Sequence, residues 1–224
     1  MLPAAFACAD WAVVVPVKRL AVAKSRLAAF GSDGREGLAL AFAEDVVRAA
    51  VACSVVRKVL VVTDDPLAAA ALAALGADVQ ADLPGAGLNP ALEHGVEVLR
   101  AQAGALGVAS LSADLPALRP EDLTAALGQT TGRAFVADSS GSGTTLLAAA
   151  AGAPLRPAYG QASAALHRAS GARELAGSAG LRRDVDTPSD LAEAVALGVG
   201  PSTSAALAVL EGPPRSPRQG TMHR

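Results

Sequence analysis

The feature that most constrains this chain is the alternation of continuous apolar runs with segments of helical period. Residues 11–17 (WAVVVPV) form a run rich in β-branched side chains, which is typical of a strand covered on both faces. Similar runs predict further strands at 57–63, 107–113, 133–137, 144–148 and 181–185. Between them, helical spacing and N-terminal Asp-Pro, Asn-Pro and Thr-Pro pairs predict helices at 37–53, 66–75, 89–103 and 187–197. This alternation predicts an α/β fold with a mostly parallel central sheet flanked by helices.

The composition supports one folded domain followed by a different kind of segment. Hydrophobic residues make up 51% of the 224 residues and charged residues 18%, which excludes disorder for the chain as a whole. Aromatic residues contribute only 3%, so the core must be built from Ala, Val and Leu. The end of the chain is rich in Pro, Gly, Ser and Arg. We therefore expect a single domain at 1–200 and a disordered C-terminal tail at 201–224.

Several classes of protein are disfavoured by charge, hydropathy and cysteine usage. A net charge of −2, with few aromatic residues and no long basic block, argues against nucleic-acid binding. Mean hydropathy is +0.36, but the longest apolar run is shorter than the roughly 20 residues that a membrane span needs. Cys8 and Cys53 form neither a disulfide framework nor a zinc motif, and the first residues lack a basic leader. We expect a cytoplasmic protein that does not bind membranes.

A basic segment follows the first predicted strand. In open parallel sheets, ligands bind beyond the carboxyl ends of the strands, so the residues that follow each strand are candidates for a site. Here Lys18, Arg19, Lys24 and Arg26 fall within nine residues, a density of cations that could hold a polyphosphate. A solvated basic face at the start of a helix explains the pattern equally well.

Carboxylates follow two other predicted strands. Asp114 ends the strand at 107–113, where a hard cation could bridge phosphates, although alone it would be interpreted as a turn residue before proline. Asp184 and Asp186, two residues apart on a predicted strand, would share one face and repel each other unless a cation lay between them. Asp65 and Asp190 have a simpler explanation as helix caps.

Glycine- and hydroxyl-rich segments provide further candidates of low specificity. Residues 85–89 (GAGLN) could approach a nucleoside before a helix, but ordinary turns look the same. Residues 139–145 (SSGSGTT) could bind a small phosphorylated acid or form a flexible hairpin. Ser163 near a helix start is commonly only a cap, and His167 is more often hydrogen-bonded than catalytic. The sequence contains no Walker loop, no GxGxxG motif and no zinc spacing.

Taken together, these segments resemble a known family. PVKRLAVAKSRLA, LVVTDD, GLNPALEHG, SADLPAL, GSGTTLL, YGQASAALHRA and DVDTPSDL occur in this order between residues 13 and 191. They are similar to the guanylyltransferases of deazaflavin coenzyme F(420) biosynthesis, which act on phosphoenolpyruvate or 2-phospho-L-lactate. The resemblance implies a nucleotidyltransferase sandwich of the nucleotide-diphospho-sugar transferase type, with GTP as donor substrate and Mg²⁺ as cofactor.

The resemblance also implies roles for particular residues. The metal would be held by three carboxylates, Asp114, Asp184 and Asp186. The acceptor would be bound by Thr144, Thr145, Gly160 and Ser163, and either threonine could make the contact. The triphosphate would face Lys18, Lys24 and Arg26, with Lys24 and Arg26 also catalytic, and the nucleoside would face Gly87, Leu88 and Asn89. The chain could form a homodimer. The resemblance also implies a downstream transferase that accepts the unstable product.

Two other functions compete with this interpretation. A nucleotidyltransferase acting on a sugar phosphate or molybdopterin would share the fold and the carboxylates, but it should carry an LAGG-like loop where this chain has PVKRL. A non-catalytic nucleotide-binding module could dispense with the metal carboxylates, so their presence argues against it. The sequence does not distinguish phosphoenolpyruvate from phospholactate by physical argument. The alanine-rich composition is typical of a high-GC, actinobacterial genome, for which the family resemblance implies phosphoenolpyruvate.

Overall fold

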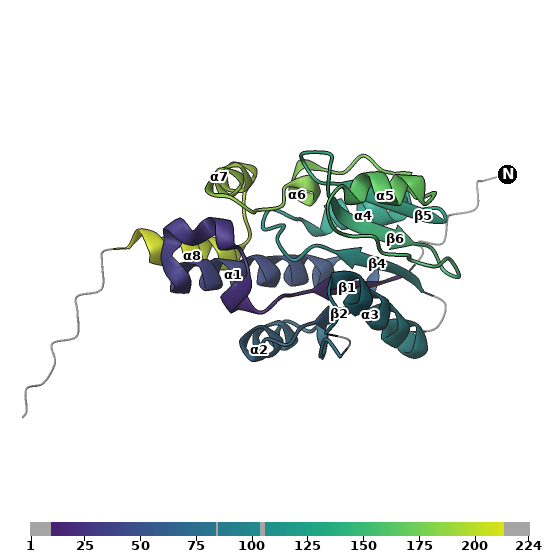
Figure 1. The fold of residues 1–224 in the computed structure, drawn as a ribbon, viewed down its shortest axis with the longest axis horizontal. Helices are drawn as coiled ribbons and strands as arrows, with labels where there is room; N and C mark the ends of the chain where they lie inside the picture. Colours follow the sequence, from purple (N-terminus) through teal and green to yellow (C-terminus); the bar gives the residue numbers. More distant parts are fainter. Residues whose placement is uncertain (1–9, 84, 104–105, 213–224) are drawn as a thin grey trace, which may run out of the picture.

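The computed structural model of this protein describes residues 10–83, 85–103 and 106–212, and within them one central sheet separates two layers of helices (Figure 1). The strands, in their order across the sheet, are β3 (Asp78–Gln80), β2 (Val56–Val62), β1 (Trp11–Pro16), β4 (Gly107–Leu111), β6 (Thr144–Ala149), β5 (Arg133–Ala137) and β7 (Arg173–Glu174). β6 runs antiparallel to its neighbours β4 and β5, and the other pairs are parallel. The predicted α/β fold with a mostly parallel sheet is confirmed.

The helices cover both faces of this sheet. They are α1 (Gly31–Ala52), α2 (Pro66–Ala74), α3 (Leu88–Ala103), α4 (Pro120–Gly128), α5 (Ser163–Ala169), α6 (Ala179–Arg182), α7 (Pro188–Leu197) and α8 (Pro201–Glu211), with short 3₁₀ helices η1 (Leu20–Val22) and η2 (Ser25–Phe30) after β1. Helices α4 and α6, which were not predicted from the sequence, contribute side chains to the same core cluster as α1 and α2, and α6 contacts β5 and β6. The described residues include no helix with the length and apolarity that a membrane crossing requires.

Alternation along β1 explains why the strand had to be apolar throughout. Val13 and Val15 point into the core formed with α1, α2 and α4, whereas Ala12 and Val14 point into the core formed with α3 and α5. All four side chains are fully buried. A strand that is buried on both faces has no polar position, which is the pattern that the sequence displayed.

Helix α8 contradicts the predicted disordered tail. Asp45, buried in α1, accepts hydrogen bonds from the backbone amides of Ser202 (3.0 Å) and Thr203 (2.9 Å), so a side chain of another helix caps the start of α8. The backbone at Gly200 lies so close to Asp45 that a Cβ there would clash. Figure 1 shows α8 beside α1, and apolar side chains of both helices form a third core cluster. The tail prediction is therefore wrong for 201–211, and 213–224 lie outside the described residues.

The strand predicted at 181–185 is also wrong. Leu181 lies in the short helix α6, which ends at Arg182, and residues 183–187 form an irregular connection to α7. Val185 is fully buried in the third core cluster, and its amide donates a hydrogen bond of 3.0 Å to the backbone oxygen of Asp114. The apolar residues that suggested a strand therefore bury individual side chains without sheet pairing.

Candidate functional site

A large cavity lies where several strands end. It has a volume of about 860 Å³, and residues after β1, β2, β4, β5 and α6 line it. Most of the residues predicted for the site line it: Lys18, Lys24, Arg26, Gly87, Leu88, Asp114, Thr144, Gly160, Ser163, Asp184 and Asp186. Two do not, Asn89 and Thr145. The cavity therefore brings together residues that are far apart in the chain.

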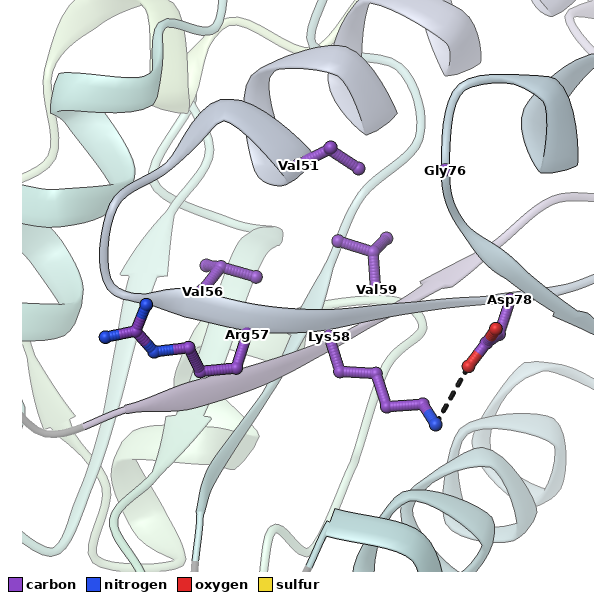
Figure 2. A pocket seen from close by; sticks show the side chains of 7 residues that line it. All are labelled: Val51, Val56, Arg57, Lys58, Val59, Gly76 and Asp78. Carbon is purple, nitrogen blue, oxygen red and sulfur yellow. Dashed lines mark ion pairs between the residues drawn. The ribbon is translucent and has the colours of Figure 1, made fainter.

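A second, smaller hollow offers a contrast. Figure 2 shows this hollow of about 300 Å³ between the end of α1, β2 and the start of β3, with an ion pair of 2.9 Å between Lys58 and Asp78. No residue predicted for the site lines it. Asp78 is 58% exposed, so this ion pair lies largely in solvent. The large cavity is the candidate site.

Two acidic residues of the large cavity share one lysine. The Nζ atom of Lys24 lies 2.5 Å from Oδ2 of Asp114 and 2.8 Å from Oδ1 of Asp186. Burial lowers the pKa of Lys24, but the charges of Asp114 and Asp186 outweigh that effect, so its pKa is raised overall. Lys24 has a left-handed backbone (φ +53°), a conformation that side chains other than Gly adopt at some cost. The residue with this strained backbone is therefore the one whose side chain forms ion pairs with both carboxylates.

A third carboxylate of the cavity, Asp184, has a strongly raised pKa. Burial, together with the nearby charges of Asp114, Asp138 and Asp186, raises the pKa of Asp184 to about 7. Asp138 also lines the cavity, and it was missed from the sequence because it ends a strand next to a Ser/Gly-rich segment. The four aspartates concentrate negative charge, which a bound cation would relieve.

The chemistry of these side chains suits a hard divalent cation, although the described residues contain no ready-made metal cluster. No group of three or more His, Cys, Asp or Glu side chains in that part of the chain is placed to hold an ion. The Lys24 ammonium lies between Asp114 and Asp186. The carboxylates still fit Mg²⁺, which takes one or two carboxylates and completes its shell with water and substrate phosphate oxygens.

The other cations of the first loop are more exposed. The Arg26 side chain is 72% exposed, and its Nη1 atom lies 3.7 Å from Oδ2 of Asp186. Lys18 is exposed at the cavity edge. The loop itself is anchored, because Asp65 accepts a hydrogen bond of 2.9 Å from the Leu20 amide. The same carboxylate caps α2, which is the role predicted for it. Arg35 donates to two backbone oxygens in the same loop. The basic residues are therefore presented by a tethered segment.

Asn89 has a different environment from the one predicted. Its Nδ2 donates to the Tyr159 backbone oxygen (3.0 Å), and its Oδ1 accepts from the Tyr159 amide (2.8 Å). The amide group is thus engaged with another loop and does not line the cavity, whereas Gly87, with φ +105°, and Leu88 do. The predicted nucleoside role of Asn89 has no geometric support, and its observed role is to join α3 to the loop at Tyr159.

The structure distinguishes the two threonines of the predicted acceptor site. Thr144 lines the cavity, whereas the Thr145 side chain is buried on the other side of β6, with Oγ1 3.5 Å from the Val136 backbone oxygen. Side chains alternate along a strand, so only one of two neighbours can face a given cavity. Gly160 and Ser163 line it together with Thr144.

The loop at 139–143 is more ordered than a flexible hairpin. The Asp138 carboxylate accepts from the amides of Ser142 (3.0 Å) and Gly143 (2.9 Å) and from the Ser140 hydroxyl (2.9 Å). These two amides already have a partner, so they do not provide the phosphate cradle that we considered from the sequence. Asp138 instead holds the turn that leads into Thr144.

Behind Thr144 lies a fully buried histidine. His167 Nδ1 is 2.9 Å from Thr144 Oγ1, and its Nε2 accepts from the Ala158 amide (3.0 Å). The Tyr159 ring packs edge-on at 5.2 Å, and its hydroxyl is 2.6 Å from Ser110 Oγ. Burial and the charge of Arg133 lower the pKa of His167 to about 4. We call Thr144, Gly160 and Ser163 the neutral lining, and Lys18, Lys24, Arg26, Asp114, Asp184 and Asp186 the charged lining.

Comparison with known proteins identifies the family. A family model described as guanylyl transferase CofC like matches residues 11–211. The chain belongs to this family. It is 56% identical over 199 residues to the phosphoenolpyruvate guanylyltransferase of Thermomonospora curvata, covering 87% of each chain. It is 57% identical over 206 residues to the protein of the same name from Streptomyces coelicolor, covering 90% of this chain and 97% of that one.

Solved structures of low sequence identity share the fold of this CofC-like chain. A nucleotidyl transferase from Methanothermobacter superposes with a TM-score of 0.59 at 20% identity, covering 83% of this chain and 95% of that one. CMP:2-keto-3-deoxy-manno-octonic acid synthetase, solved with CTP, gives 0.54 at 17% identity, covering 84% and 98%. The predicted nucleotidyltransferase sandwich and the family resemblance are thus both confirmed.

Proposed function

We propose that this chain transfers GMP from GTP to the phosphate of phosphoenolpyruvate and releases pyrophosphate, as a step of coenzyme F(420) biosynthesis. The observation that carries the proposal is that one cavity unites the charged lining with the neutral lining, although their residues are up to 168 positions apart in the chain (18 to 186). The names of the relatives in Thermomonospora curvata and Streptomyces coelicolor favour phosphoenolpyruvate over 2-phospho-L-lactate.

The reaction needs positioning and charge neutralisation more than acid–base chemistry. An acceptor phosphate oxygen, already ionised at neutral pH, forms a bond to the α-phosphorus of GTP, and the bond from that phosphorus to the bridging oxygen of pyrophosphate breaks. No covalent enzyme intermediate is needed, and no proton has to be removed from the nucleophile. Holding the two anions in line is therefore the main task of the protein.

The charged lining suits the donor side of this reaction. Lys24, held between two carboxylates, places an ammonium group where phosphate oxygens and carboxylates would meet, and Lys18 and Arg26 add charge at the cavity edge. Asp114, Asp184 and Asp186 would hold Mg²⁺, which when bound supplies neutralisation of phosphate charge. Gly87 and Leu88 offer close backbone approach and an apolar contact for the nucleoside.

The neutral lining suits the acceptor. Thr144 and Ser163 present hydroxyl groups and Gly160 presents backbone with φ +137°, a conformation open to glycine. Phosphoenolpyruvate carries a phosphate and a carboxylate, and hydroxyl donors can bind both. We further propose that the activated product passes to a downstream transferase.

Pyrophosphate release tests this function directly. Purified protein would be incubated with GTP and Mg²⁺ and with phosphoenolpyruvate, 2-phospho-L-lactate, a sugar phosphate or molybdopterin, and GTP would be replaced by ATP or CTP in parallel. We expect release with GTP and phosphoenolpyruvate and its loss when a chelator removes the divalent ion. Release with the sugar phosphate or molybdopterin alone would instead support a related nucleotidyltransferase, and binding of GTP without release in any mixture would support a nucleotide-binding module.

A further inference from the structure

The environment of His167 determines which nitrogen carries its proton. The Ala158 amide can only donate a hydrogen bond, so Nε2, 3.0 Å away, must accept and is unprotonated. Burial and the charge of Arg133 lower the pKa of His167, so the ring is neutral at neutral pH. A neutral imidazole carries one proton, so that proton lies on Nδ1.

The same reasoning assigns the hydrogen bond to Thr144. Nδ1–H donates across 2.9 Å, and Thr144 Oγ1 therefore accepts. A threonine hydroxyl has one proton of its own, which this contact does not use. Among the described residues, His167 is the hydrogen-bond partner of Thr144 Oγ1, and Thr144 lines the cavity. The Thr144 proton is therefore available to a bound molecule.

We propose that His167 is a positioning residue that makes the Thr144 hydroxyl a hydrogen-bond donor to an anionic oxygen of the acceptor. The inference rests on the proposed function, in which Thr144 contacts the phosphorylated acid. A hydrogen bond accepted from His167 polarises the hydroxyl and strengthens the bond that it donates. With a different ring tautomer, Thr144 would have to donate to Nδ1 and would present only lone pairs to an anion.

The surroundings of the ring keep it in this orientation. The Tyr159 ring packs edge-on against it with ring centroids 5.2 Å apart, and the Phe135 ring packs at a tilt of 49° with centroids 5.9 Å apart. Rotating the ring by 180° would place carbon atoms against the Ala158 amide and the Thr144 hydroxyl and leave two buried polar groups without a partner. The backbone amide of Ala158 thus acts through the imidazole on a hydroxyl in the cavity.

Two amide substitutions separate this role from simple packing. In His167→Asn the side-chain nitrogen can occupy the place of Nδ1, so the donor to Thr144 is retained and the acceptor for Ala158 is lost. In His167→Gln the side-chain oxygen can occupy the place of Nε2, so the acceptor is retained and the donor to Thr144 is lost. Each variant removes one buried hydrogen bond, and we expect similar losses of thermal stability.

Steady-state kinetics of pyrophosphate release then provide the test. We expect His167→Gln to raise KM for phosphoenolpyruvate at least 10-fold, His167→Asn to raise it about threefold, and both to leave KM for GTP within about twofold. Thr144→Ser, which keeps the hydroxyl, should resemble the wild type more closely than Thr144→Val. The double variant Thr144→Val, His167→Gln should be no worse than Thr144→Val alone, because both act on one hydrogen bond.

The outcomes distinguish this inference from the proposed function. Equal KM values in the Asn and Gln variants, or additive effects in the double variant, would overturn the positioning role while wild-type turnover left the proposed function intact. A wild-type protein that releases no pyrophosphate with either phosphorylated acid would overturn the proposed function, and the inference with it. A rise in KM for GTP that matches the rise in KM for phosphoenolpyruvate would indicate a general structural effect and would also overturn the positioning role.

Discussion

The charged and neutral linings of one cavity are held in place by different physical means. Lys24, which has a strained backbone conformation, meets Asp114 and Asp186 through ion pairs that are partly open to solvent. Thr144 is held from behind by His167, which is neutral, buried and hydrogen-bonded on both nitrogens. Ion pairs exchange readily with phosphate and metal, whereas buried neutral hydrogen bonds keep their geometry. We therefore expect the charged lining to rearrange when substrates bind and the neutral lining to be preformed.

Substitution of a central carboxylate should have the largest effect. We expect Asp114→Asn to lower kcat/KM about 1000-fold, which corresponds to about 4 kcal/mol of transition-state stabilisation, because it removes charge that a divalent ion would use. Pyrophosphate release would measure the loss. Asp78→Asn, in the second Lys–Asp pair shown in Figure 2, is the matched control and should retain activity. Near-normal turnover of the Asp114 variant would remove this carboxylate from the reaction.

Neutralising Lys24, whose side chain is only 12% exposed, should have the next largest effect. We expect Lys24→Met to lower kcat/KM about 100-fold, the scale of losing one fixed group that stabilises developing charge. The same change at Arg26, whose side chain is 72% exposed, should cost about 10-fold, and raised salt should reduce its contribution further. If the two variants lost the same activity, burial would not be what distinguishes these two cations.

Acidification should weaken the neutral lining. The pKa of His167 is about 4 in the folded protein and about 6.5 when unfolded, so unfolding takes up a proton at any pH between these values. The free energy of unfolding should therefore fall as the pH drops from 6.5 to 4, by about 2–3 kcal/mol from this group. Urea titrations of wild type and His167→Asn at several pH values would isolate the contribution, because the variant lacks it. If the unfolding free energies of the two proteins changed with pH in parallel, the imidazole would not stay neutral in the folded protein.

The smallest effect is expected at Asn89, which joins α3 to the loop that leads to Gly160 in the neutral lining. Asn89→Ala removes two hydrogen bonds to the Tyr159 backbone, and we expect a loss of about 2 kcal/mol in unfolding free energy because partly buried backbone groups lose their partner. Asn89→Asp keeps the acceptor for the Tyr159 amide and should lose less. KM for GTP should change little in either variant. A large rise in that KM with unaltered stability would restore the nucleoside-binding role predicted from the sequence.

The local features of this fold were predictable because their causes are local. The strand β1 has no polar residue because both faces are buried. The side chains of Asp65 and Thr187 cap their helices by accepting hydrogen bonds from backbone amides only two or three residues further along the chain. Failures occurred where a distant partner decides the outcome. Helix α8 needs Asp45 from α1 as its cap, and Val185 is buried without joining the sheet, so neither pattern could be interpreted from neighbouring residues.

The site divides in the same way. The order of residues along the chain was enough to show which chemical groups could meet at a site: the cations after β1, Asp114 after β4, the pair Asp184 and Asp186, and the Gly-Thr-Thr segment after β5. Their partners were set only by the folded chain, since Lys24 meets carboxylates 90 and 162 positions away, Asn89 bonds to Tyr159, and His167 bonds to Thr144. Periodicity and capping depend on spacing along the chain, which the sequence contains. Contacts between the ends of strands depend on their order in the sheet, which arises only when the whole chain packs.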